Sequence, residues 1–208
     1  AASGIQFTRN TPDMTAASSI AASNAGNYDL HLALHSNAVG SGQQSTVRGI
    51  DAYYYPASVN GKRFADIAAN NLQLIYPLPG MVKTVPTTRL GEVARVRAPG
   101  VLIELGYHDN PLDADWIRNN INNIAENLVL SLTEYFGIPF NMPQPIQVGY
   151  VSTEGSNLNI RSRPDIGAPI IGKIPNGSEI VIYNRLPEWD LAGYGGVMGY
   201  VSSRYVAV

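Results

Sequence analysis

The residues best suited to chemistry are three histidines, His31, His35 and His108, and a carboxylate, Glu104. Glu104 lies in the apolar run 101–105, and His35 stands where another apolar run gives way to a loop rich in Gly and Ser. Imidazole and carboxylate groups serve hydrolases as metal ligands and as general acids or bases. These residue types therefore indicate a hydrolytic or metal-binding site.

The spacing of His31 and His35 argues against a shared metal ion. Four residues along a straight strand span roughly 13 Å at about 3.3 Å per residue. Zinc binds imidazole nitrogen at roughly 2.0–2.1 Å, so two histidines that far apart cannot be ligands of one ion. We expect His31, which lies deeper in the predicted strand, to be structural, and His35 to point into a cleft.

Glu104 has two alternative interpretations. A carboxylate among Val, Leu and Ile is costly to bury unless it is ion-paired, metal-bound or a base with a raised pKa. The structural alternative is an ion pair with Arg95 or Arg97. His108, four residues further on, could be a metal ligand, a proton donor to the leaving group or a surface residue.

Strand and helix patterns alternate in the first part of the chain. Apolar or aromatic runs at 30–35, 50–55 and 101–105 predict strands. Residues 62–75 have the spacing of a helix, and so do residues 111–136, with Asn110 as the N-cap. This pattern predicts an α/β domain with a mixed sheet flanked by helices. Ligands of such sheets bind beyond the carboxyl ends of the strands, where His35 and Glu104 fall.

The composition excludes several classes of protein. Of 208 residues, 45% are hydrophobic, which is enough for a folded core. Lys and Arg number 14 against 16 Asp and Glu, so a nucleic-acid partner is not expected. No apolar run approaches the roughly 18 residues of a membrane span. The absence of Cys removes thiol nucleophiles and Cys-ligated zinc. Ala1–Gly4 does not resemble a signal peptide, so any export signal is expected upstream.

A change in composition divides the chain. Three prolines between Gly137 and Pro145 predict an extended linker. We therefore predict an α/β domain over 1–138, a Pro-rich linker over 139–147 and a small all-β barrel over 148–208. The barrel prediction rests on short β runs separated by turns such as Asn176-Gly177 and Gly195-Gly196.

Residues 4–138 resemble the zinc-dependent N-acetylmuramoyl-L-alanine amidases, bacterial wall hydrolases with an amidase-3-type catalytic domain. The matching blocks follow one another in the family's order: Ile5-Gln6-Phe7-Thr8-Arg9 as a strand, the segment from Ser23-Asn24 through His35-Ser36-Asn37-Ala38, Arg48 to Tyr54, and Pro99 to Asn110. Several ordered blocks are more specific than one short motif.

The resemblance implies a zinc hydrolase that cuts the amide between muramic acid and L-alanine of the stem peptide in peptidoglycan. By the same resemblance, His35 matches the last zinc ligand and Glu104 the catalytic glutamate. Asn37 and His108 are candidates to orient substrate or ligand. The location implied is secreted or bound to the bacterial wall.

The family's first block, with its first strand, an early histidine ligand and a glutamate ligand, has no counterpart here. The chain is then a fragment, which we favour, or a non-catalytic wall-binding protein with a degenerate metal site, or a divergent enzyme in which His108 is an extra ligand. Without that strand, we expect an exposed sheet edge.

Residues 148–208 resemble a bacterial Src-homology-3-like domain. The segments that carry this resemblance are Gly149-Tyr150-Val151, Leu158 to Pro164, Ile171 to Ile180 and, with Trp189, Gly199-Tyr200-Val201. In exported bacterial proteins this fold often binds peptidoglycan peptides. Trp189 and Tyr194 are the wall-binding candidates, with Tyr200 and Tyr205 as further members of an apolar platform. The alternative is that Trp189 and Tyr200 fill the barrel core.

Overall fold

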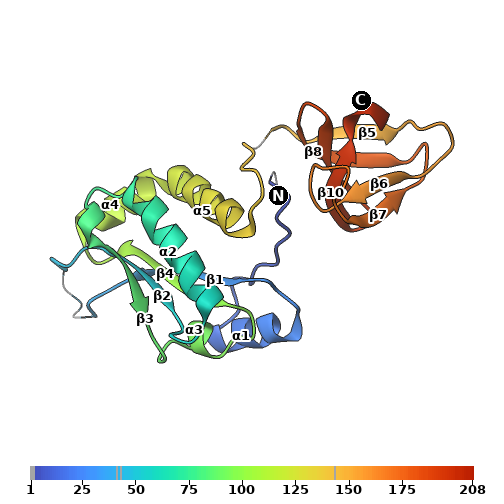
Figure 1. The fold of residues 1–208 in the computed structure, drawn as a ribbon. Helices are drawn as coiled ribbons and strands as arrows, with labels where there is room; N and C mark the ends of the chain where they lie inside the picture. The colour runs from blue at the N-terminus through green and yellow to red at the C-terminus, as the bar shows by residue number, and fades with distance from the viewer. Residues whose placement is uncertain (1–2, 41, 43, 143) are drawn as a thin grey trace. The chain divides into compact units, whose positions relative to one another are not determined.

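The structure is a computed structural model that describes residues 3–40, 42, 44–142 and 144–208. The described chain separates into two compact units (Figure 1). One unit is Arg9–Phe136. The other joins the segment that ends at Thr8 to Gly137–Val208. The residues that could do chemistry at a hydrolytic site, His35 and Glu104, both lie in the first unit.

In the described part of the first unit, four strands form a mixed sheet in the order β1-β4-β2-β3. Their bounds are β1 His31–Asn37, β2 Ile50–Tyr54, β3 Val82–Pro86 and β4 Gly100–Tyr107. β1 runs parallel to β4, whereas β2 runs antiparallel to β4 and parallel to β3. The mixed sheet confirms the predicted fold class. β1 pairs with β4 alone among the described strands, so it lies at the expected exposed edge.

Helices cover both faces of this sheet. Their bounds are α1 Ala16–Ala25, α2 Val59–Gln73, α3 Gly91–Ala94, α4 Pro111–Asn119 and α5 Ile121–Phe136, with a 3-10 turn, η1, at Pro79–Met81. α2 and α5 lie side by side across one face (Figure 1), where Phe64 and Leu128 pack in the main core. On the other face, Val93 of α3 packs against Ala33 and Leu102. The side chains of odd-numbered β1 residues, including His35, point to this second face.

The predicted helix over 111–136 is two helices. Asn110 accepts hydrogen bonds from the backbone N–H groups of Leu112 and Asp113, which confirms the predicted N-cap. Asn120 caps the C-terminal end of α4, and its side-chain amide donates to the carbonyl of Trp116 at 2.9 Å. Such a local bond competes with the helical backbone pattern. Beyond the break, Ile121 at the start of α5 is 62% exposed and lies outside the apolar core.

The strand predicted over Ile5–Arg9 is wrong, because these residues have no regular secondary structure. The segment instead packs on the second unit. The Tyr200 hydroxyl donates to the carbonyl of Ser3 at 3.3 Å, and both residues are 2% exposed. Gln6 donates through its amide to the carbonyl of Met198. Hydrogen bonds to the barrel therefore replace those that a sheet would have supplied.

The second unit is an antiparallel barrel-like sheet with the strand order β11-β5-β8-β9-β10-β6-β7 in its described residues. The bounds are β5 Gln147–Val151, β6 Leu158–Arg161, β7 Ile170–Ile174, β8 Glu179–Arg185, β9 Trp189–Tyr194, β10 Val197–Ser202 and β11 Val206–Ala207, with a 3-10 turn, η2, at Ser203–Tyr205. Gly195 and Gly196 both have positive φ and form the tight turn between β9 and β10, as in a type I′ hairpin. This all-β architecture confirms the predicted class.

The predicted linker is hydrogen-bonded to the barrel. Asn184 donates to the carbonyl of Met142 at 3.0 Å, and the side chain of Gln144 accepts from the backbone of Arg185. Pro143, one of the three prolines on which the linker was predicted, lies outside the described residues. The two residues on either side of it are thus fixed to β8.

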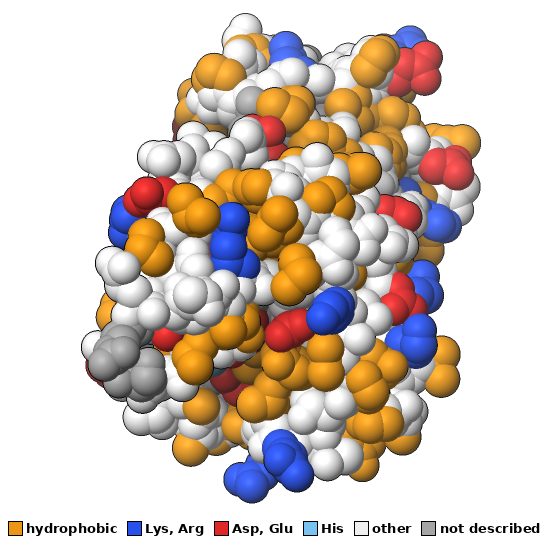
Figure 2. Space-filling model, turned by 90° about the vertical axis from the view of Figure 1, so that its left-hand side faces the viewer, with side chains coloured by type: hydrophobic (Ala, Val, Ile, Leu, Met, Phe, Trp, Pro, Cys, Tyr) orange, Lys and Arg blue, Asp and Glu red, His pale blue; other side chains and the backbone are white. Residues whose placement is uncertain are grey.

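Two surface properties bear on partners. No described helix is both long enough and apolar enough to cross a membrane. On the face drawn in Figure 2, Lys and Arg side chains stand singly or in small groups, several of them beside Asp or Glu. That face offers no broad basic surface of the kind that follows a phosphate backbone.

Candidate active site

His35 and Glu104 occupy the same position in the register of two neighbouring strands. β1 and β4 are parallel, and His35 is the partner of Glu104. Side chains at paired positions of adjacent strands point to the same face of a sheet. Both residues are near the carboxyl ends of their strands, at the edge where α/β sheets bind ligands. The structure thus brings together the two residues that the sequence singled out.

Glu104 is flanked on its other side by Asp51, its partner on β2. The Glu104 side chain is half-buried, and its Oε2 atom is buried with no hydrogen-bond partner in the described chain. Burial raises the pKa of Glu104 and Asp51 raises it further, while His35 and His108 act in the opposite direction. A carboxylate with a raised pKa and an unpaired oxygen has the properties of a general base.

The structural alternative for Glu104 is not found. No ion pair joins Glu104 to Arg95 or Arg97 in the described residues, and both arginines are exposed. Their backbones instead bind the side chain of Asn24, which accepts from Arg97 N at 2.7 Å and donates to Arg95 O at 2.8 Å. Neither arginine of the segment that leads into β4 is therefore an ion-pair partner of Glu104.

Glu92, in the first turn of α3, is a carboxylate that the sequence interpretation missed. Its Oε2 atom lies 3.1 Å from Nε2 of His35. Its Oε1 atom lies 3.9 Å from Nε2 of His31. The two histidines, too far apart along the strand to be joint ligands of an ion, are thus linked through one carboxylate.

His31 is the more enclosed of the two imidazoles. Its side chain is 12% exposed, against 43% for His35. Nδ1 of His31 is hydrogen-bonded to the Ser23 hydroxyl at 3.0 Å. Burial lowers the pKa of His31, and Glu92 offsets part of that shift. The Nε2 atom of His31 is buried and has no hydrogen-bond partner in the described chain, so the ring is held at Nδ1 alone. An enclosed imidazole of this kind fits a supporting position rather than an accessible one.

The loops that follow β1 and β4 are tied to each other near the site. The backbone N–H of His108 donates to the carbonyl of Asn37 at 2.9 Å. The imidazole Nδ1 of His108 lies 3.0 Å from the Ser36 hydroxyl. The side chain of Asn37 accepts from the backbone of Ala38. Asn37 and His108 therefore lie together beside the His35–Glu104 pair, with His108 exposed to solvent.

A buried aspartate in α4 anchors the end of β4. Asp113 is 0% exposed. It accepts hydrogen bonds from Nε of Arg48 and the hydroxyl of Tyr76, each at 2.7 Å. The backbone N–H groups of Tyr107 and Gly49 complete its shell. Burial by itself would raise the pKa of Asp113, but these donors together lower it. The carboxylate thereby joins the end of β4 to the start of β2.

Asp51 is a second functional neighbour that sequence reasoning missed. Its Oδ2 atom accepts from the Tyr53 hydroxyl at 3.2 Å. Burial and this carboxylate raise the pKa of Tyr53 to about 12. The available signal was a single acidic residue inside an aromatic strand, the same kind of signal that identified Glu104. No comparable signal marked Glu92, since it lies in a short helix outside any strand pattern.

The zinc ion implied by the resemblance can be tested against these residues. In residues 3–40, 42, 44–142 and 144–208, no group of three or more acidic or histidine side chains is placed to hold a metal. A catalytic zinc takes three protein ligands. The described residues therefore do not supply a set of three ligands. His35 is a single candidate ligand, whose Nε2 faces the Glu92 carboxylate and whose Nδ1 has no partner in the described chain. Glu104, with its unpaired oxygen, fits the base beside it.

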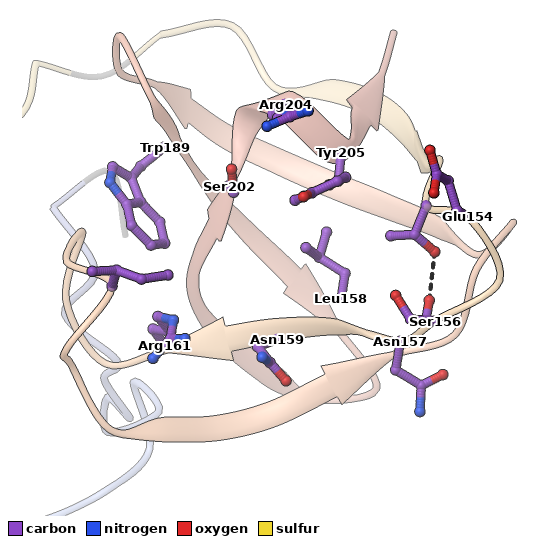
Figure 3. Close-up of a pocket in the computed structure, with 12 residues that line it drawn as sticks. Glu154, Ser156, Asn157, Leu158, Asn159, Arg161, Trp189, Ser202, Arg204 and Tyr205 are labelled. Atoms are coloured by element: carbon purple, nitrogen blue, oxygen red, sulfur yellow. Dashed lines mark hydrogen bonds between the residues drawn. The ribbon is translucent and has the colours of Figure 1, made fainter.

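The barrel has a groove of about 390 Å³ at the loop between β5 and β6 (Figure 3). Trp189 and Arg161 lie at one end and Glu154 at the other, with Leu158 and Tyr205 between them. Trp189 is half-buried and lies outside the buried barrel core, whereas Tyr200 is buried. Tyr200 is not part of the apolar core cluster either, since its hydroxyl donates to the carbonyl of Ser3 and its ring lies against the N-terminal segment. The core alternative is therefore not found for either residue.

Tyr194, the other wall-binding candidate, lines a different groove. This cavity, of about 480 Å³, also involves Tyr183 and Met198 and is bordered by Ile5 and Phe7 of the N-terminal segment. Trp189 and Tyr194 therefore belong to two separate surfaces of the barrel unit.

Comparison with known proteins agrees with this architecture. The family model described as N-acetylmuramoyl-L-alanine amidase (Amidase_3) matches residues 2–134. The model described as a bacterial SH3 domain matches residues 156–207. No curated protein matches the chain.

Several solved structures share the fold. The catalytic domain of CD27L endolysin, which targets Clostridia difficile, is 25% identical over 57% of this chain and 62% of its own, with a TM-score of 0.50. The catalytic domain of CwlV, an N-acetylmuramoyl-L-alanine amidase from Bacillus (Paenibacillus) polymyxa var. colistinus, is 20% identical over 61% of this chain and 68% of its own, with a TM-score of 0.51.

An N-acetylmuramoyl-L-alanine amidase from Clostridium difficile 630 is 18% identical over 60% of this chain and 66% of its own, with a TM-score of 0.51. The chain thus spans somewhat under two thirds of the endolysin domain. Since the family match extends from residue 2 to residue 134 and a second match follows it, the chain belongs to the Amidase_3 family of N-acetylmuramoyl-L-alanine amidases and carries a bacterial SH3 domain.

Proposed function

We propose that this chain is a zinc-dependent peptidoglycan hydrolase that cleaves the amide between N-acetylmuramic acid and L-alanine of the stem peptide. The observation that supports it most is the pairing of His35 with Glu104 at one position of the β1–β4 register. The pair provides a metal ligand and a base on one face of the sheet. In this proposal the hydrolase acts on the bacterial cell wall and is secreted or wall-associated.

Glu104 is the proton carrier in this proposal. Its buried, unpaired oxygen accepts the proton of the attacking water and then donates it to the nitrogen of the departing L-alanine. Burial and Asp51 favour return of the proton to Glu104, because both raise its pKa. His35 would be one of the zinc ligands, and the bound ion would supply Lewis-acid activation of the water and the amide carbonyl. Asn37 and His108, tied together at the rim, orient the substrate.

The barrel binds the wall in this proposal, through the groove that contains Trp189. That groove has an aromatic wall, a carboxylate at Glu154 and the guanidinium groups of Arg161 and Arg204. A stem peptide has carboxylate and ammonium groups as well as apolar side chains, so it matches both charges. Binding by the barrel raises the local concentration of wall amides around the catalytic domain.

Two variants test the catalytic proposal. Release of dye from labelled peptidoglycan with added zinc should be fast for the wild type and lower by about 10²–10⁴-fold for Glu104→Ala. Elemental analysis after zinc soaking should find metal in the wild type and less in His35→Ala. Equal dye release by the wild type and Glu104→Ala would reject Glu104 as the catalyst.

The second candidate function is a non-catalytic wall-binding protein. It is favoured by the finding that the described residues place no three potential metal ligands together. In that case the wild type would bind purified peptidoglycan without releasing dye at any zinc concentration. Retention on the wall together with absence of hydrolysis separates this alternative from the enzyme.

A further inference from the structure

The groove of the barrel that contains Trp189 has opposite charges at its two ends (Figure 3). The guanidinium of Arg161 lies at the end with Trp189, and the carboxylate of Glu154 lies at the other end. Leu158, which is 6% exposed, and Tyr205 lie between them. Neither Arg161 nor Glu154 forms an ion pair within the described chain. Two unlike charges are therefore held apart across an apolar surface, and both are available to a ligand.

The Arg161 end of the groove fits a carboxylate. Arg161 is half-buried, and its Nη1 atom donates to the carbonyl of Ala168 at 2.8 Å, which orients the guanidinium. The remaining N–H donors lie in a planar fork that matches the two oxygens of a carboxylate. The other guanidinium of the groove, Arg204, is exposed and lies 5.7 Å from the centre of the Tyr205 ring. We therefore assign the carboxylate to the more enclosed Arg161.

The Glu154 end of the groove fits an ammonium group. The loop that carries Glu154 is held by its neighbour Thr153, whose backbone N–H donates to Oδ1 of Asn176 at 2.7 Å. The Thr153 hydroxyl donates to the carbonyl of Ser156 within the same loop (Figure 3). The Glu154 side chain is exposed and has no hydrogen-bond partner among the described residues. Because a carboxylate can only accept, its natural partner is a cationic donor.

We propose that this groove binds a wall peptide in one direction, with the terminal carboxylate of the peptide at Arg161 and a free side-chain ammonium at Glu154. The inference rests on the proposed wall binding by the barrel and defines which peptides bind. Trp189 and Tyr205 contact the apolar parts of the peptide between the two charged groups. Arg161 and Glu154 are thus the residues that determine specificity.

This arrangement selects against cross-linked peptides. A cross-link joins a carboxyl group of one wall peptide to an amine of another as an amide. Each of the two joined peptides therefore lacks one of the charges that the groove pairs. A peptide in which both groups are free makes both charged contacts and binds more tightly. The barrel then holds the hydrolase at parts of the wall where peptides are not cross-linked.

The test measures the affinity of the full chain for synthetic peptides by isothermal titration calorimetry. The first peptide, acetyl-L-Ala-D-Glu-L-Lys-D-Ala, has both the lysine ammonium and the terminal carboxylate free. In the second the lysine amine is acetylated, which makes it an amide as cross-linking does, and in the third the terminal carboxylate is amidated. The second peptide should bind about two- to fivefold more weakly than the first, as expected for an exposed ion pair. The third should bind about tenfold more weakly, because its partner is an enclosed guanidinium.

Two variants assign the charges to the ends of the groove. Glu154→Lys should bind the acetylated-lysine peptide more tightly than the free peptide, because like charges repel. Arg161→Gln should bind the free peptide about tenfold more weakly and no longer distinguish it from the amidated one. Glu188→Lys and Arg163→Gln, at exposed positions outside the groove lining, are the matched controls and should bind like the wild type. Circular dichroism checks that each variant is folded.

The outcomes separate this inference from the wall-binding function beneath it. If the full chain is retained on purified peptidoglycan but binds the three peptides equally or not at all, the directional groove is wrong and wall binding stands. The same conclusion follows if Glu154→Lys keeps the wild-type preference. If the full chain is not retained on peptidoglycan and binds no peptide, the wall-binding function fails and the inference fails with it.

Discussion

His35 of β1 is the direct register partner of Glu104 of β4, and the two strands are parallel. This relationship places an imidazole and a carboxylate from distant parts of the sequence on one face and at one edge of the sheet. Had β1 shifted by a single residue, His35 would point to the face covered by α2 and α5, because side chains alternate along a strand. The register is therefore the structural basis of the proposed site.

The Asp113 network should be the main polar contribution to the stability of the α/β unit. Asp113→Asn leaves Arg48 and Tyr76 without their charged acceptor, and we expect a loss of about 3 kcal/mol in the free energy of unfolding. Urea unfolding followed by Trp116 fluorescence, in a Trp189→Phe background, measures this unit alone. Asp115→Asn, exposed on the same helix, is the control and should change stability by less than about 0.5 kcal/mol. A similar small change in Asp113→Asn would contradict the prediction.

The same aspartate gives a pH dependence with a definite sign. The pKa of Asp113 in the folded state is below its ordinary value of 3.8. The ionised carboxylate therefore adds stability that is fully present above that value and is lost as the pH falls through the folded pKa. The stability difference between wild type and Asp113→Asn should be constant near neutral pH and shrink below 3.8. A difference that grows as the solution is acidified would show that the pKa is shifted in the other direction.

The N-terminal segment should stabilise the barrel through Tyr200. Tyr200→Phe removes the hydrogen bond to the buried carbonyl of Ser3, which we expect to cost about 1 kcal/mol. Deletion of residues 1–7 should cost more, since it also uncovers the Tyr200 ring. Tyr150→Phe is the matched control, because Tyr150 is exposed and its hydroxyl donates to the exposed Glu179 side chain.

Unfolding of the barrel can be followed by Trp189 fluorescence in a Trp116→Phe background. If the barrel has the same free energy of unfolding in the deletion variant as in the full chain, residues 3–7 contact the barrel without stabilising it.

The two grooves of the barrel make different predictions for wall binding. Trp189→Ala should weaken binding to purified peptidoglycan by at least about tenfold, as expected for a central aromatic contact. Tyr194→Ala changes only the second groove and should bind as the wild type does. Co-sedimentation measures both, with circular dichroism to confirm folding. If only Tyr194→Ala lost binding, the wall-binding surface would be the groove beside residues 5–7, and the prediction for Trp189 would be wrong.

Local sequence predicted three of the four described strands of the mixed sheet and the two candidate site residues, but it did not mark β3 or the neighbours of His35 and Glu104. His35 and Glu104 stand at the ends of apolar runs, and that position is visible in the sequence. Asp51 became a neighbour of Glu104 because β2 pairs antiparallel to β4, and strand order is not encoded in local periodicity. Glu92 reaches His35 from a four-residue helix, too short to give a helical pattern.

Two elements were misjudged for physical reasons that lie outside the pattern. The apolar spacing over 111–136 is continuous, yet the Asn120 side chain bonds to the backbone and ends α4. Residues 5–9 alternate as a strand would, but they lack a pairing strand and instead contact the barrel through Gln6. In both cases a specific polar contact decided the structure.

The most direct test of the central claim is the identity of the bond that is cut. Purified peptidoglycan should be incubated with the wild type and with Glu104→Gln at saturating zinc, and the products analysed by mass spectrometry. The account predicts intact stem peptides with a free L-alanine amino terminus from the wild type, and about 10²–10⁴-fold less from Glu104→Gln. Absence of these peptides with the wild type, or equal amounts with Glu104→Gln, would contradict it.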